Sequence, residues 1–127
     1  MPEVDFMITE IKKQLEALHY VVYTQPQEKQ LGKKELLLRL AVISFGPDYV
    51  TGLYDMPVGI DIEFQEPEPA AVVTTIVDIV KNLEPAVKAG TDPDKLMFKF
   101  DRITITPLGQ YYRVIIGCQY TEVIDIV

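Results

Sequence analysis

Residues 96–120 read LMFKFDRITITPLGQYYRVIIGCQY, and this stretch decides the fold. Side chains alternate in kind along residues 96–106 and again along 111–120, which is the period of a β-strand with two unlike faces. Between the two runs, Pro107 pre-sets the backbone for a turn and Gly109 supplies a left-handed residue. The stretch therefore predicts a long β-hairpin that closes through a bulged turn at residues 106–109.

The rest of the chain predicts two amphipathic helices and three further strands. Helical spacing of apolar residues marks 2–18 and a second helix from Pro69, which Pro85 should bend or end. Strands are expected at 20–23, at 36–45, which is apolar enough to be covered on both faces, and at 58–64. Residues 25–34 resemble an exposed loop, 46–48 a turn, and 50–57 either a loop or part of a hairpin. The second helix should present a broad apolar face, made of Val72, Val73, Ile76, Val77, Val80 and Leu83.

The expected element order is α-β-β-β-α-β-β. Hairpin-like connections favour a mainly antiparallel sheet of about five strands with two helices packed on one face, an α+β fold. The chain has 127 residues, of which 48% are hydrophobic, and this suits one domain (1–127) whose core needs no metal or disulfide. An open sheet of this kind has two edges, which proteins either blunt or use for assembly.

Charge and composition exclude several classes of function. The formal net charge is −7 and the basic residues are scattered, which argues against DNA or RNA binding because that affinity depends on phosphate neutralisation. Lys29, Lys33, Lys34 and Arg39 form either a local basic patch or, as we prefer, part of a solvated loop. Because the sequence shows no leader peptide and no apolar run of membrane-spanning length, we expect a protein made in the cytoplasm without membrane contact.

Few residues suggest nucleophilic or cofactor chemistry. Cys118 falls in phase with apolar residues of its strand, so we expect it to be buried and unreactive. The single histidine, His19, follows the first helix, and no motif links it to Cys118 or to a serine. No glycine spacing matches a phosphate-binding loop. We therefore assign no catalytic residue, no cofactor and no bound metal.

The strongest carboxylate grouping is Asp61 and Glu63, which share one face of a strand while Ile60, Ile62 and Phe64 face the other way. Pro47-Asp48 followed by Glu63-Phe64-Gln65 resembles the restriction-endonuclease-like nucleases, a family that holds Mg²⁺ with an acid and an acid-x-lysine pair. Gln65 stands where that lysine is expected. We prefer a solvent-facing strand edge and keep a metal-dependent nuclease using Asp48, Asp61 and Glu63 as an alternative.

The C-terminal segment, residues 121–127, is apolar where termini are usually polar. Val123, Ile124, Ile126 and Val127 should either continue the last strand over their own core or add to the sheet of a neighbouring subunit, and we favour the neighbour. Tyr111 and Tyr112 are adjacent on one strand, so one of them should face the core. We expect Tyr111 to join these tail residues at a subunit interface.

The whole pattern of an amphipathic helix, long loop, central strands, second helix and closing hairpin resembles the tail terminator or tail-completion proteins of tailed bacteriophages. Its closest part is the hairpin, with RITIT at 102–106 and GQYYRVIIGCQY at 109–120. The resemblance implies a non-enzymatic virion protein of the tail or neck, assembled in the host cytoplasm. Such a protein forms a homo-oligomeric ring, commonly a hexamer, and contacts the tail tube protein and neck or connector proteins. Alternatives are another small tail or baseplate component, the nuclease, or an acidic protein-interaction or immunity module.

Overall fold

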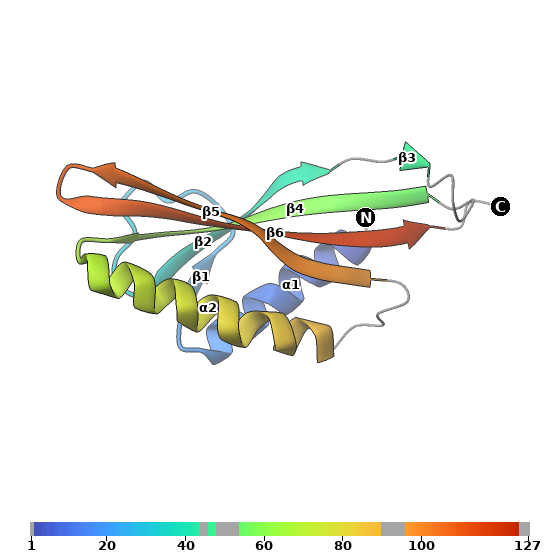
Figure 1. Cartoon of the computed structure of the whole chain (residues 1–127), viewed down its shortest axis with the longest axis horizontal. Coiled ribbons are helices and arrows are strands. Elements are labelled where there is room, and N and C mark those ends of the chain that lie inside the picture. The colour runs from blue at the N-terminus through green and yellow to red at the C-terminus, as the bar shows by residue number, and fades with distance from the viewer. Residues whose placement is uncertain (1, 44–45, 48–53, 90–95, 125–127) are drawn as a thin grey trace.

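The computed structural model describes residues 2–43, 46–47, 54–89 and 96–124. The main sheet has the strand order β1-β2-β4-β6-β5, with β3 paired to β4 beside it, and both helices lie on one side of the sheet (Figure 1). Apart from the short β3, this confirms the predicted α+β fold and its element order. The elements are α1 (Pro2–Ala17), β1 (Val21–Tyr23), β2 (Glu35–Ile43), β3 (Gly46–Pro47), β4 (Tyr54–Glu66), α2 (Pro69–Ala89), β5 (Leu96–Leu108) and β6 (Tyr111–Ile124).

The centre of the sheet is the antiparallel pair β4 and β6, which run along the longest dimension of the molecule (Figure 1). All 13 residues of β4 pair with β6. Alternate residues of β4 face the helices, and Ile60, Ile62 and Phe64 are buried there as predicted. On β6 their counterparts Ile116 and Cys118 are also buried. Since strand residues alternate between faces, Asp61 and Glu63 lie on the other side, which we call the outer face.

The two helices complete the core. α1 contributes Ile11 and Leu15, and α2 contributes a stripe at helical spacing, Val72, Ile79, Leu83 and Val87. The prediction of a broader apolar face on α2 is wrong at Val73 and Val77, which are 60% and 54% exposed. Each follows a core-facing position by one residue, which is about 100° around the helix, so it lies on the flank of α2.

The first connection departs from the hairpin pattern because β1 and β2 are parallel. A tight turn cannot join parallel strands, so residues 24–34 must cross back to the start of β2. These residues form the predicted loop and are mostly exposed, but Leu31 is buried. Leu37 of β2 is buried on the outer face, and it lines the same cavity as Leu31. The loop therefore covers part of the outer face, and β2 is covered on both faces at this point, as predicted.

Regular structure continues at two places where the sequence predicted that it would end. Pro85 does not end α2, which continues to Ala89. Proline removes the hydrogen bond to the carbonyl of Lys81, but Lys81 is exposed, so water can solvate that carbonyl. Gly46 and Pro47, predicted to form a turn, are β3 and pair with β4. Asp48 and residues 50–53 lie outside the described residues, whereas 54–57 belong to β4.

The C-terminal end of α1 is a Schellman motif. Tyr20 N donates to Leu15 O at 3.3 Å and His19 N donates to Glu16 O at 3.0 Å. His19 has a φ of 71°, the left-handed conformation that usually selects glycine at this position. The single histidine of the chain therefore has a structural place as a helix cap.

The β5–β6 hairpin closes through two residues, Gly109 and Gln110. Gly109 has a φ of 68° and Gln110 has no positive φ, which matches a type II′ turn with glycine first. The predicted bulge at the turn is wrong, because Pro107 and Leu108 still pair with β6. The irregularity of β5 lies instead between Phe100 and Arg102, where Asp101 is the extra residue.

We predict that Gly109→Val destabilises the chain by about 1–2 kcal/mol, because a β-branched residue strains the left-handed conformation although no atom lies within 4 Å of the added Cβ. Chemical denaturation measures the change. Gln110→Val is the matched control and should have a much smaller effect. Equal losses in the two variants would show that backbone strain at Gly109 is not the cause.

Candidate interaction surfaces

The outer face carries a network of arginines and acids. Arg39 Nη2 on β2 donates to Glu63 Oε1 at 2.9 Å, and Arg113 Nε on β6 lies 3.7 Å from the same oxygen. Arg102 Nη2 on β5 donates to Asp61 Oδ1 at 3.0 Å. The side chains of Asp61 and Glu63 are only 13% and 11% exposed. Carboxylates with so little water around them require such partners, because an unpaired buried charge is costly.

This pairing bears directly on the nuclease alternative. The structure places Asp61 and Glu63 on one face, as predicted, but commits each to a guanidinium group. The prediction of a solvent-facing strand edge is wrong, because β4 lies in the centre of the sheet and arginines from other strands cover both carboxylates. A divalent cation there would meet the repulsion of three arginines. Asp48 lies outside the described residues, and within the described ranges no three His, Cys, Asp or Glu side chains converge. The geometry supports a charged protein surface better than a metal centre.

Gly117 leaves space for the ion pair between Arg102 and Asp61, whose strands are separated by β6. It lies on β6 between Arg102 of β5 and Asp61 of β4, and pairs with both. A Cβ on Gly117 would come within 2.8 Å of Arg102 Cγ and of Asp101 Oδ1. The Arg102 side chain therefore crosses β6 at the one residue whose lack of a side chain permits it.

Gly117→Ala should displace Arg102 from Asp61 and lower the free energy of unfolding by about 1 kcal/mol, within the range for a strained, partly buried ion pair. Thermal or chemical unfolding checks this. In an Arg102→Ala background the methyl group added by Gly117→Ala no longer meets the Arg102 side chain, so Gly117→Ala should lower the free energy of unfolding by less. Identical penalties in both backgrounds would contradict this role for Gly117.

Cys118 is buried as predicted. Its Sγ donates to Ile60 O at 3.4 Å, and burial raises the pKa of the thiol to about 12, with Asp101 and Asp61 adding to the rise. The thiol is therefore held in its protonated, weakly nucleophilic form at neutral pH.

The predicted basic group is divided between two sides of the molecule. Lys29 and Arg39 line a cavity on the outer face, whereas Lys33 and Lys34 line a pocket on the helix side. Lys34 Nζ lies 4.6 Å from the centre of the Tyr20 ring, a cation–π contact. These four cations therefore do not act as one patch, although Lys29, Lys33 and Lys34 are exposed on the loop as expected.

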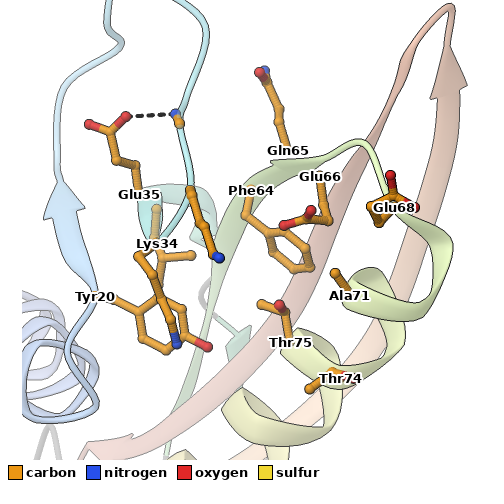
Figure 2. Close-up of a pocket in the computed structure, with 13 residues that line it drawn as sticks. Tyr20, Lys34, Glu35, Phe64, Gln65, Glu66, Glu68, Ala71, Thr74 and Thr75 are labelled. Atoms are coloured by element: carbon orange, nitrogen blue, oxygen red, sulfur yellow. Dashed lines mark hydrogen bonds between the residues drawn. The ribbon is translucent and has the colours of Figure 1, made fainter.

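The helix-side pocket lined by Lys33 and Lys34 has a volume of about 410 Å³ and lies between the start of β2, the end of β4 and the start of α2. Figure 2 shows Tyr20, Phe64 and Thr75 around its interior, with Glu66 and Glu68 near the start of α2. Tyr20 donates to Asp78 Oδ2 at 2.7 Å; burial, followed by this hydrogen bond, raises the pKa of its hydroxyl. Tyr20 therefore remains a protonated hydrogen-bond donor. The pocket is lined by both glutamates and lysines, so it does not favour a ligand of one charge.

Glu35 fastens the crossing loop to the sheet. Its carboxylate accepts from Tyr23 Oη and from Gly32 N, each at 2.6 Å, and Lys29 Nζ is 3.7 Å away (Figure 2 shows the bond to the backbone). The Tyr23 hydrogen bond, then the Gly32 one, lowers the pKa of Glu35 below its ordinary 4.5. A lowered folded-state pKa gives stability that is complete above pH 4.5 and is lost as pH falls through the folded value.

Glu35→Gln should therefore lower the melting temperature at pH 7 and flatten its fall between about pH 5 and pH 3, because the variant has no carboxylate to protonate. Thermal unfolding of both proteins across this range is the test. Parallel pH profiles would contradict a contribution from Glu35.

A second surface lies along the sheet edge formed by β5. Ile103 and Ile105 on this strand are 46% and 47% exposed on the face that carries the helices, and Val73 and Val77 of α2 are exposed beside it. Val73 and Ile105 share the wall of a nearly apolar groove of about 220 Å³. We call Val73, Val77, Ile103 and Ile105 the β5–α2 strip. The sequence analysis did not predict this strip. The feature that could have indicated it is the apolar face of α2, which is wider than the area that a helix buries against a single sheet.

The predicted interface residues are only partly within the described chain. Val123 and Ile124 pair with Asp55 and Tyr54 of β4, so their backbone continues the chain's own sheet rather than a neighbour's. Ile126 and Val127 lie outside the described residues. Tyr111 is half-buried, and its neighbour Tyr112 packs against the core as one of the pair was expected to. A role for Tyr111 and the tail in subunit contacts stays a prediction.

No protein-family model matches the sequence, and a search of curated proteins found no significant match. Within the described residues, neither helix combines the length and apolar character needed to cross a membrane.

Proposed function

We propose that the chain is a non-enzymatic subunit of a homo-oligomeric ring at the end of a phage tail, where it joins the tail tube to the neck. The observation that carries the proposal is the β5 edge, whose outer side pairs with no strand among the described residues, together with the β5–α2 strip beside it. The order of elements and the closing hairpin, which resemble the tail terminator and tail-completion proteins, support the choice of assembly.

The β5 edge is suited to limited rather than open-ended pairing. Its regular backbone is interrupted by the bulge at Asp101 and by Pro107, which has no N–H to donate. Interruptions of this kind protect an edge from continuous strand addition. Residues 102–106 remain regular between them, and Ile103 and Ile105 supply exposed apolar area there. A neighbour docked here would therefore gain mainly side-chain contacts with the β5–α2 strip.

A ring requires a heterologous interface, in which one patch meets a different patch on the next subunit. The β5–α2 strip supplies one such patch in this proposal. Tyr111 and the apolar tail, at Val123, Ile124, Ile126 and Val127, supply the unlike patch of the neighbour in this proposal, while the backbone of Val123 and Ile124 pairs with β4 of its own chain. A hexamer in the virion tail or neck, with the tail tube and connector proteins as partners, follows from the resemblance alone. The alternative is another small tail or baseplate component, since such proteins also end in a helix followed by a hairpin.

Ile105→Lys should weaken self-association at least tenfold, because burying one isoleucine contributes about 1.5–3 kcal/mol and a buried lysine adds a further cost. Size-exclusion chromatography with light scattering over a concentration series measures the mass. The control is Thr104→Lys, which adds the same charge on the other face of the same strand and should assemble as the unmodified chain does.

Two outcomes would contradict this proposal. One is a protein that remains monomeric throughout the concentration series, and the other is equal weakening by both lysine variants. A chain that ends at Ile124 examines the tail separately: loss of the ring with an unchanged melting temperature would support the contribution of Ile126 and Val127, and intact rings would remove it.

A further inference from the structure

A cavity of about 220 Å³ lies on the outer face, beneath the loop that connects β1 to β2. Its walls include Lys29 from the loop and Arg39, Glu63, Gln65 and Arg113 from three adjacent strands. The cavity is on the opposite side of the sheet from the helices, so it shares no residue with the β5–α2 strip.

The cavity has a surplus of positive charge in a chain whose net charge is −7. Arg39 and Arg113 converge on the same oxygen of Glu63, and in the described chain Glu63 is the one acid within ion-pair distance of either arginine. Lys29 is 3.7 Å from Glu35, which leaves one guanidinium beyond the acids of the site. Both arginines remain partly exposed, with 40% of each side chain open to solvent. An anionic group entering the cavity would therefore meet a net positive charge and would compete or share with Glu63 for charge-assisted hydrogen bonds from these two guanidinium groups.

Two buried atoms of the cavity sharpen the choice of ligand. Arg113 Nε and Gln65 Oε1 are shielded from solvent and have no hydrogen-bond partner among the described residues. They belong to residues that face each other across β4 and β6. Arg113 Nε needs a hydrogen-bond acceptor and Gln65 Oε1 needs a donor. Leaving either hydrogen bond unformed costs about 1–3 kcal/mol. A ligand that carries an anionic oxygen next to an N–H would satisfy both.

We propose that this cavity binds a carboxylate-bearing segment of a polypeptide. The carboxylate lies between Arg39 and Arg113 and accepts from Arg113 Nε, while a backbone N–H of the segment donates to Gln65 Oε1. A nucleic-acid backbone fits less well, because phosphodiesters offer no N–H and a long polyanion would extend over the acidic remainder of the surface. The carboxylate comes either from an acidic side chain or from a chain terminus.

Isothermal titration of the full-length protein at low salt distinguishes these sources. One probe is an acetylated and amidated peptide of alternating Gly and Asp, which has only side-chain carboxylates. The other is an acetylated Gly–Ser peptide with a free C-terminal carboxylate. Binding of one probe at micromolar to millimolar concentration, with inorganic phosphate much weaker, supports the proposal and identifies the source.

Arg113→Gln should weaken the binding peptide about tenfold or more, since a charge-assisted hydrogen bond contributes about 1.5–3 kcal/mol. Lys99→Gln is the matched control, because it removes one exposed positive charge from β5 outside the cavity. If Arg113→Gln fails to fold, amide chemical-shift changes at Gln65 and Arg113 in the unmodified protein replace it. Absence of binding by both peptides, binding of phosphate alone, or equal weakening by the two variants would overturn the proposal.

Discussion

The pairing of β4 with β6 is the interaction on which the rest of the structure depends. One face of this pair carries Ile60, Ile62 and Ile116 against the helices, and the other presents Asp61 and Glu63 to arginines from neighbouring strands. A slip of one residue would exchange these faces, placing carboxylates in the core and isoleucines in water. The hydrophobic alternation and the ion pairs therefore specify the same register.

The consequence extends to the strands on either side. β2 and β5 meet this central pair in registers that bring Arg39 to Glu63 and Arg102 to Asp61. Isolated surface ion pairs contribute little to stability, but these acids are largely shielded from water, so each is costly without its arginine. Gly117 keeps the path across β6 open for one of them. The polar outer face thus constrains strand order together with the apolar core.

Much of this fold could be predicted from local patterns. Alternation located the hairpin and β4, and helical spacing located α1 and α2, because these signals need only neighbouring residues. What could not be predicted depended on distant partners. The parallel pairing of β1 follows from where its chain returns, and the exposure of Val73 and Val77 follows from how α2 lies on the sheet. Asp61 and Glu63 were located on the correct face, but no local pattern reveals that arginines from three other strands reach them.

The two candidate surfaces have complementary physical characters. The β5–α2 strip is apolar, and apolar burial supplies most of the free energy of association. The outer face is charged and contains unused donors, and such groups contribute orientation and selectivity more than affinity. A ring subunit that holds its neighbour through the first surface keeps the second free for a different polypeptide. In these two proposals, one small sheet serves both contacts because the two surfaces are separate.

Amide hydrogen exchange at low and high protein concentration tests the central claim most directly, because it reports each strand separately. The amides of β4 at residues 58–63 and of the central part of β6 should be protected at every concentration, since both stretches are paired on two sides. The amides of β5 at residues 102–106 and of α2 near Val73 and Val77 should become slower to exchange as the ring forms. Unchanged exchange at the β5 edge in a sample whose mass has risen would contradict the account, because assembly would then use another surface.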